Sequence, residues 1–500
     1  MAETSKENPR ALAPRYPRVA AFKNVEDFRK HLSSLDVEFG CDDEILRAPE
    51  SPLAQACQIG DKCVGNRFAI QPMEGWDGTE DGMPTDYVRR RWRNFGLSGA
   101  KLLWGGEAFA VCPEGRANPN QLMACKSTRE GIRELFGITI AAHHERYGTT
   151  DDLMLGLQLT HSGRFCRPFS KTRMEPCIAY HHPILDSKFG LEPDYPIVTD
   201  DYLKNLIELY VEAAGIAWDV GFNFVDIKHC HGYLGHELLS AFTRPGPFGG
   251  SFENRMRFCR EIVEGIRTET PQLQIGLRLS AIDKVPFRPD PNETQGKQMG
   301  IGIPESFKEL LPYYYGFGLD PNDPVEMDLN EPQKFLAALS ELGVNLINLT
   351  CGSPYYNPHI QRPALFPPSD GYQPPEDPLV GVGRQLALTK KLKATFPSMV
   401  FVGSGYSYLQ EFLPLVGQAA VRCEGVDFVG LGRFVLSYPD LPHDILYGDG
   451  KLVRKSICRT FSDCTTAPRN GIVSGCFPLD GFYKNSAEFH QLKKIKASMS

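Results

Sequence analysis

Residues 399–405 read MVFVGSG and residues 426–433 read VDFVGLGR. Each segment is a short run of β-branched and aromatic residues, typical of a buried strand, that opens directly into glycines. Barrels built from parallel strands commonly bind a phosphate group on the loops after their seventh and eighth strands. These segments are therefore predicted to be the last two strands of such a barrel, although glycines that serve only as turn residues would look the same.

Six further runs of this kind precede them, which gives eight predicted strands. They cover Arg67–Gln71, Lys101–Trp104, Leu153–Leu159, Asn223–Ile227, Gln274–Leu279, Val344–Leu349, Met399–Val402 and Val426–Leu431. Helical patterns lie between most of them. Apolar residues recur every three to four positions over Asp201–Val220, Phe252–Arg267 and Glu331–Leu342, and Gly221 and Gly343 follow the first and third as helix ends. Strand and helix alternating eight times predict an α/β protein with a (β/α)8 TIM barrel.

An open, doubly wound parallel sheet is the alternative fold for alternating strands and helices. That fold would carry a Gly-x-Gly-x-x-Gly turn after an early strand, and the sequence has none there. The closed barrel is therefore preferred.

Two regions flank the barrel, which we expect over residues 51–450, and two long segments lie within it. Residues 1–50 are predicted to form an extension packed across the bottom or edge. Residues 451–500 form a cysteine-containing tail. Long segments rich in Pro and Tyr, residues 284–330 and 352–382, follow the fifth and sixth strands. Loops of that length are usually functional, and after barrel strands they would wall a substrate pocket.

The composition restricts the class of protein. The chain has 54 basic and 61 acidic residues and a net charge of −7, without the basic face that nucleic-acid binding requires. Its 14 cysteines are scattered, which favours reduced thiols in a cytosol. The first residues lack the apolar core of a signal peptide, and no apolar run approaches the length of a membrane span. A cytoplasmic metabolic enzyme acting on a small molecule is expected, without nucleic-acid or membrane partners.

In a barrel, reactive residues gather at the C-terminal ends of the strands. There the sequence places polar side chains and glycines in a coherent set. Gly106 would let the backbone approach a planar ligand closely, and Arg433 offers a guanidinium suited to a phosphate dianion. The full set is Pro72, Met73, Gly106, Gln158, Lys228, His231, Tyr233, Arg278, Gly403, Ser404, Gly405, Gly432 and Arg433.

Seven motifs, six of them at these positions, resemble the old yellow enzyme family of FMN-dependent oxidoreductases, over roughly residues 55–450. They read NRFAIQPM, QLTHSGR, HGYLGHELLS, GGSFENRMRF, GLRLS, VGSG and GLGRF. The combination is highly specific. The resemblance implies FMN held over the barrel mouth and NAD(P)H as the reductant.

The resemblance also implies roles for individual residues. Pro72 and Met73 would line the flavin, Gln158 would bind its pyrimidine edge, and Arg278 would stabilise negative charge on the reduced ring. The phosphate would be held by Gly403, Ser404, Gly405, Gly432 and Arg433.

For catalysis, the family uses a pair of side chains on strand four to hold an electron-withdrawing oxygen of the substrate. Hydride addition to an electron-poor C=C, as in an enone or enoate, builds enolate charge at that oxygen, so donors there act in the transition state. His231 and Lys228 occupy the two positions, and Tyr233 would supply the proton to the other carbon. The alternative for Tyr233 is a packed aromatic residue beside Leu234.

Lys228 departs from the family pattern, which commonly has His-x-x-His or His-x-x-Asn, whereas this chain reads Lys228-His229-Cys230-His231. A lysine brings a cation unless burial depresses its pKa. We expect Lys228 to favour a more anionic oxygen, such as an enolate or carboxylate. The alternative is that Lys228 points away into an ion pair with Asp226 or Glu237. His229 and Cys230 are taken as structural.

The tail resembles the four-cysteine [4Fe–4S] segment of multidomain relatives of the trimethylamine dehydrogenase and 2,4-dienoyl-CoA reductase type. Cys458, Cys464 and Cys476 fall on the first, third and fourth positions, but Phe461 takes the second. Such a cluster normally needs four thiolates. Three interpretations stay open: no metal, which is preferred, a cluster with three cysteines, or a fourth thiolate from elsewhere, such as Cys423.

Two rival functions also stay open. Oxidation of an amine or another saturated substrate, as in the trimethylamine dehydrogenase branch, would use the same fold. A flavin-binding or redox-sensing module without turnover would suit the altered strand-four pair. Reduction could come from NAD(P)H docking directly or from a separate electron-donor protein, and a homo-oligomer is left open.

Overall fold

The computed structural model describes residues 15–294, 299–368 and 371–499. Its centre is a closed barrel of eight parallel strands, since β3 pairs with β13 and β4 pairs with both β3 and β6. The strands, in order around the barrel, are β3 (Phe68–Ile70), β4 (Leu102–Leu103), β6 (Met154–Thr160), β7 (Phe224–His229), β8 (Gln274–Ser280), β11 (Leu346–Thr350), β12 (Val400–Gly403) and β13 (Phe428–Leu431). The predicted TIM barrel is confirmed.

A short strand, β5 (Ala108–Ala110), continues the sheet along β6 beyond the end of β4. The barrel interior is filled at its lower end by apolar side chains, among which Trp104 and Phe224 meet edge to face with ring centroids 5.1 Å apart. The barrel is therefore packed below, and only its upper end can hold a ligand.

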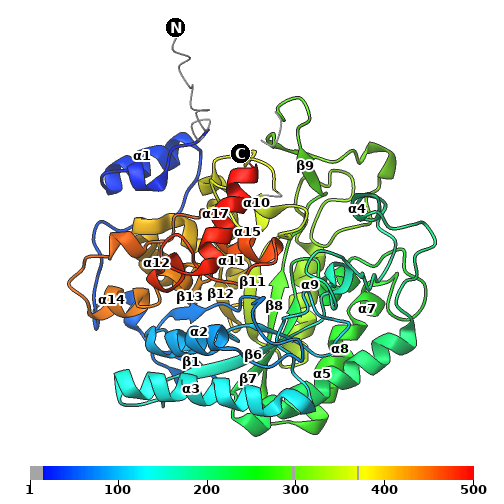
Figure 1. Ribbon diagram of the computed structural model, residues 1–500, viewed down its shortest axis with the longest axis horizontal. Helices are drawn as coiled ribbons and strands as arrows, with labels where there is room; N and C mark the ends of the chain where they lie inside the picture. The colour runs from blue at the N-terminus through cyan, green and yellow to red at the C-terminus, as the bar shows by residue number, and fades with distance from the viewer. Residues whose placement is uncertain (1–14, 295–298, 369–370, 500) are drawn as a thin grey trace.

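An outer layer of helices covers the strands (Figure 1). It comprises α2 (Asp86–Leu97), α3 (Arg129–Tyr147), α5 (Asp200–Val220), α8 (Arg257–Glu269), α9 (Asn330–Glu341), α11 (Pro378–Thr395), α12 (Leu413–Arg422) and α14 (Leu441–Tyr447). Shorter helices lie in the connections: α4 (Pro183–Phe189), α6 (Leu234–Leu239), α7 (Phe252–Arg255), α10 (Pro358–Gln361) and α13 (Phe434–Ser437).

Two predicted helices show how well the boundaries could be placed. The helix expected over Asp201–Val220 is α5, capped by the Thr199 side chain and ended by Gly221 at φ +117°. The helix expected over Phe252–Arg267 is interrupted, because α7 and α8 meet at Met256. Arg255 ties the short α7 to Glu331, which fixes it as a separate turn.

The N-terminal segment packs on the side of the barrel around the β12–β13 connection. In α1 (Val25–Ser34), Phe28 stacks on Phe412 with ring centroids 4.2 Å apart, and Asp42 binds Arg422 of α12. A hairpin of β1 (Cys57–Ile59) and β2 (Lys62–Val64) follows, and its Gly65 amide donates to the Asp152 carbonyl just before β6. This hairpin closes the lower end of the barrel.

The two long loops follow β8 and β11, as expected, at the C-terminal ends of these strands. The first contains a hairpin of β9 (Phe287–Pro289) and β10 (Gly302–Pro304). A bridge between Ile301 and Gln373 joins the two loops. Residues 295–298 and 369–370 of these loops lie outside the described residues.

The C-terminal tail folds back onto the barrel through α15 (Asp463–Arg469), α16 (Gly481–Lys484) and α17 (Ala487–Met499), drawn in orange to red in Figure 1. Asp480 binds Arg90 of α2 at 2.8 Å, and Ser474 accepts a hydrogen bond from the Trp76 amide. The tail therefore reaches the loop after β3. Among the described residues, no helix combines the length and apolar character needed to cross a membrane.

Candidate active site at the barrel mouth

A cavity of about 200 Å³ opens at the C-terminal ends of the strands. Its wall comes from the ends of β3, β6, β7, β8, β12 and β13, from the loop after β11 and from the tail. The structure brings eleven of the predicted site residues to this wall: Pro72, Met73, Gln158, Lys228, His231, Tyr233, Arg278, Ser404, Gly405, Gly432 and Arg433.

Gly106 and Gly403, by contrast, do not line the cavity. Gly106 has φ +55°, and a side chain there would meet the Trp92 ring at 2.8 Å. The carbonyl of Gly403 accepts a hydrogen bond from the side-chain amide of Gln71. Both glycines shape the backbone behind the cavity wall.

Tyr233 is the centre of a polar group on one wall of the cavity. Its hydroxyl donates to Glu74 Oε2 at 2.5 Å and lies 3.0 Å from the Tyr355 hydroxyl. The Lys228 ammonium lies over the Tyr233 ring, 3.6 Å from its centroid, and 4.0 Å from Glu74 Oε2. Three segments therefore meet at the Tyr233 phenol: β7, the turn after β3 and the loop after β11.

Burial and the nearby charges determine the protonation states of Tyr233 and Lys228. Burial, followed by the Glu74 carboxylate, raises the pKa of Tyr233 well above its ordinary value. Burial lowers the pKa of Lys228, while Glu74 opposes that shift. Tyr233 therefore keeps its proton at neutral pH, and the ammonium above its ring would stabilise a developing phenolate.

His231 lies on the same wall, in a left-handed backbone conformation with φ +66°. Its backbone amide donates to Ser280 Oγ at 2.9 Å, and its Nε2 accepts from the side-chain amide of Gln361 at 3.3 Å. Burial, together with Arg278 and Lys228, holds the pKa of His231 well below its ordinary value. The ring is neutral at pH 7, with its Nδ1–H available as a donor.

The alternative that Lys228 points away to pair with Asp226 or Glu237 is wrong. Asp226 accepts from the Gln158 side chain at 2.5 Å and from the Arg278 amide at 2.7 Å. Glu237 pairs with Arg164. Lys228 belongs to β7 itself and faces the cavity with His231, so the strand continues past the predicted end at Ile227.

The wall beneath this group offers donors for a planar, electron-rich ring. Arg278 donates from Nη1 to the Pro72 carbonyl at 3.1 Å, while its buried Nε has no partner among the described residues. Thr350 also lines the cavity and has a buried hydroxyl without a partner in the same part of the chain. Buried polar groups are rarely left unpaired, so these two call for a ligand. They fit the pyrimidine side of FMN.

The other end of the cavity suits a phosphate. Gly405 has φ +94°, and a side chain on Gly432 would meet only Gln71, at 3.7 Å. Arg433 lies on the same wall, where its guanidinium donates to Thr465 Oγ1. Ser404 donates to the Leu349 carbonyl at 2.6 Å, so its hydroxyl holds the turn together. Gly405, Gly432 and Arg433 therefore border one cavity, which Arg362 and Arg469 also line.

The tail cysteines do not form a four-thiolate site. Burial, followed by Cys464 and Cys458, raises the pKa of the Cys476 thiol, so the three tail cysteines are neighbours. Phe461 is 41% exposed and packs beside Phe366. Cys423 ends α12 before β13, at the opposite end of the barrel. With Phe461 at the second position, this group offers three of the four thiolates that a [4Fe–4S] cluster normally needs.

Sequence reasoning missed Glu74, Tyr355 and Gln361. Glu74 directly follows the motif that ends at Met73, but a carboxylate in a turn carries no signal of its partner 159 residues away. Tyr355 and Gln361 lie in the loop after β11, which was predicted only as a pocket wall.

Comparisons with known proteins agree with this geometry. Residues 52–305, just over half of the chain, match the model of the NADH:flavin oxidoreductase / NADH oxidase family. An NADPH dehydrogenase of Clostridium acetobutylicum is 30% identical over 236 residues, which cover 46% of this chain and 64% of that protein. The matched region therefore spans less than two thirds of that relative.

Solved structures share the fold. One is a complex of 2-naphthoyl-CoA reductase, with 19% identity, a TM-score of 0.60 and coverage of 88% of this chain and 58% of that one. Another is an old yellow enzyme homologue from Zymomonas mobilis, with 19% identity, a TM-score of 0.52 and coverage of 78% and 91%. The family match and the barrel-mouth site together show that this chain belongs to the NADH:flavin oxidoreductase / NADH oxidase family, the old yellow enzyme family that its motifs predicted.

Proposed function

We propose that this protein is an FMN-dependent NAD(P)H oxidoreductase that reduces electron-poor C=C bonds, such as those of enones and enoates. One observation carries the proposal: a protonated Tyr233 shares one cavity wall with two oxygen-binding candidates, Lys228 and His231. The NADPH dehydrogenases among its relatives support the choice of reductant.

FMN bound in the cavity would supply the hydride, which it receives from NAD(P)H. Lys228 and His231 would hold the electron-withdrawing oxygen of the substrate and strengthen their hydrogen bonds as negative charge develops there. Arg278 would sit below, against the pyrimidine edge, and Arg433 with the amides of Gly405 and Gly432 would bind the phosphate.

Tyr233 would donate its proton to the alkene carbon that does not receive the hydride. The ammonium of Lys228, 3.6 Å from the ring centroid, would stabilise the phenolate that forms. Glu74, at 2.5 Å, offers a path for the proton to return to Tyr233.

The direct test starts from the absorption spectrum of the purified protein, with the released flavin identified. The coloured protein is bleached with NADPH or NADH without oxygen and then mixed with cyclohexenone. Return of the absorbance, with formation of cyclohexanone, is expected. Bleaching by amines in place of NAD(P)H would favour the dehydrogenase alternative, and a coloured protein that reacts with neither would favour a flavin-binding module without turnover.

Arg433→Leu should weaken FMN binding. Losing a charged hydrogen bond to a phosphate costs about 1.5–3 kcal/mol, which corresponds to a Kd raised by about 10- to 100-fold. The measurement is quenching of FMN fluorescence by apoprotein. Arg422→Leu, on the exposed end of α12, is the matched control and should leave the Kd unchanged. Equal affinity in both variants would remove Arg433 from the phosphate site.

Lys228→Met should weaken binding of a phenolate ligand. An ammonium that binds an anionic oxygen contributes about 1.5–3 kcal/mol, so a loss of about 10- to 100-fold is expected. A para-substituted phenol is titrated into the FMN-bound protein and followed by the change in flavin absorbance. Lys204→Met, on the exposed face of α5, serves as the control. Unchanged affinity in Lys228→Met would rule out its role in binding substrate oxygen.

A further inference from the structure

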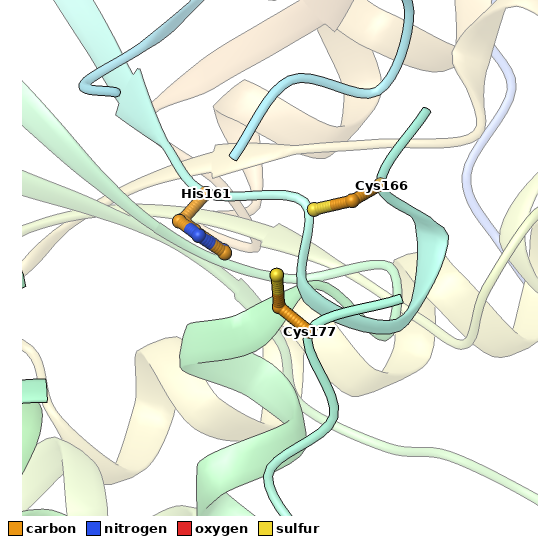
Figure 2. A group of neighbouring side chains, drawn as sticks. All are labelled: His161, Cys166 and Cys177. Carbon is orange, nitrogen blue, oxygen red and sulfur yellow. The ribbon is translucent and has the colours of Figure 1, made fainter. Parts of the chain in front are cut away.

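Figure 2 shows a group of side chains that could bind a metal, and none of its three residues lines the cavity. His161 follows β6, Cys166 follows the short 3-10 helix η4 (Gly163–Phe165), and Cys177 lies eleven residues further on. One ligand atom from each lies within 4.8 Å of the other two. It is the only such group in the part of the chain that the structure describes.

The backbone holds the two cysteines together. The amides of Cys166 and Cys177 both donate to the carbonyl of Gly163, at 3.1 and 3.0 Å. All fourteen cysteines of the chain are free thiols. A single carbonyl therefore fixes two sulfurs from distant positions next to one imidazole, as Figure 2 shows.

The surroundings of this group favour a cation. Tyr202 places its hydroxyl 2.7 Å from His161 Nε2 and 3.5 Å from Glu114 Oε1. Cys112, a further buried thiol, lies close to Glu114 and Tyr202. Among the described side chains, no lysine or arginine forms an ion pair with Glu114. The pocket thus contains thiols, a phenol, an imidazole and a carboxylate.

We propose that His161, Cys166 and Cys177 form a binding site for a zinc-class divalent ion. Two sulfurs and one imidazole nitrogen are the donors that Zn²⁺ prefers in tetrahedral sites, and they discriminate against the harder Mg²⁺ and Ca²⁺. Binding forms two metal–thiolate bonds and releases two thiol protons, so the dication is neutralised inside a buried site.

One nitrogen of His161 must be freed for the metal. The Gly163 amide donates to Nδ1 at 3.1 Å, so Nε2 carries the ring proton and donates to Tyr202. The ion would take the place of the Gly163 amide at Nδ1. The chain from Nε2–H through Tyr202 to Glu114 would persist, and outer partners of this kind commonly orient metal-binding histidines.

The ion would be structural, because it would fix the loop that supports the active site. Phe165, next to Cys166, stacks on Tyr355 with ring centroids 3.9 Å apart and lies 6.2 Å from the Tyr233 ring. A clamp at Cys166 and Cys177 would hold Phe165 in place and, through Tyr355, the wall around Tyr233.

The test is Co²⁺ binding to the full chain after chelator treatment and reduction under nitrogen. We expect one equivalent to give the visible bands of tetrahedral cobalt and the near-ultraviolet charge-transfer band of thiolate ligands. Zn²⁺ should displace it and raise the melting temperature. Cys177→Ser and His161→Gln should lose or strongly weaken both effects, whereas Cys259→Ser, which removes a buried thiol of α8, should keep them.

A further variant separates this site from the tail cysteines. Cys464→Ser should retain the cobalt spectrum, and its loss there would assign the metal to the tail and overturn the proposal. The proposal also fails if reduced wild-type protein gives no thiolate band, or if Cys177→Ser binds cobalt as the wild type does. The readouts are spectroscopic and thermal, so they do not depend on enzymatic activity, and Cys177, being half-buried, is the substitution least disruptive to folding.

Discussion

Tyr233→Phe is expected to slow alkene reduction by about 10²- to 10⁴-fold, the usual contribution of a positioned general acid. The substitution removes only the hydroxyl that donates to Glu74, and the ring can still pack below the Lys228 ammonium. Reduction of the flavin by NADPH does not use this proton, so its rate should change little. Stopped-flow absorbance measures the two half-reactions separately, which distinguishes lost proton donation from disturbed flavin binding.

Tyr355→Phe is the matched control, because the Tyr355 hydroxyl lies 3.0 Å from that of Tyr233 and on the same cavity wall. It should slow alkene reduction far less than Tyr233→Phe. The reverse order would make Tyr355 the proton donor, and equal rates in Tyr233→Phe and wild type would show that the proton comes from solvent.

The sequence predicted the barrel well because each of its strands is a short apolar run with a polar or glycine end. The ends of the strands were harder to predict, because a buried strand can continue through polar residues where these face a binding cavity. Asn223–Ile227 was predicted, whereas β7 runs over Phe224–His229 and includes Lys228. Lys228 stays in the ladder because it pairs with Arg278 of β8, a contact that local pattern does not encode.

The candidate site was predictable where a motif carries its own chemistry, as with Arg278 and Tyr233. It was not predictable where function depends on distant partners. Glu74 acts on Tyr233 only because the turn after β3 faces the end of β7 across the barrel mouth. The group around Cys166 was missed for the same reason, since a lone cysteine in a loop shows nothing of the histidine and second thiol that the fold brings to it.

Arg91→Leu should lower the free energy of unfolding by about 3–5 kcal/mol, since it removes one partner from a buried ion pair. Arg91 of α2 binds Asp77 at 2.7 Å and Glu107 at 2.9 Å, and all three side chains are at most 6% exposed. Without the guanidinium, two carboxylates would stay buried and uncompensated. The measurement is the urea midpoint followed by tryptophan fluorescence.

The pH dependence of this loss identifies its cause. Burial raises the pKa of Glu107 to about 7 although Arg91 opposes the shift, so Arg91→Leu should raise it further. An acid whose pKa is higher in the folded than in the unfolded state destabilises the protein at pH values above its unfolded pKa. This destabilisation shrinks as pH falls, because burying the neutral acid costs less free energy than burying the carboxylate. The deficit of Arg91→Leu relative to wild type should therefore be smaller at pH 5 than at pH 8.

Arg89→Leu, two residues from Arg91 on the same helix, is the control. Its partners Asp86 and Glu134 are exposed, so it should cost less than about 1 kcal/mol and show no such pH dependence. If the loss in free energy of unfolding of Arg91→Leu is constant from pH 5 to 8, its cause is lost packing and not the unpaired carboxylates.

The same substitution should also affect the active site. Asp77 and Glu107 lie directly against Gly75, the residue after Glu74. Unpaired charge there should therefore disturb the Glu74–Tyr233 hydrogen bond and lower the rate of alkene reduction along with stability.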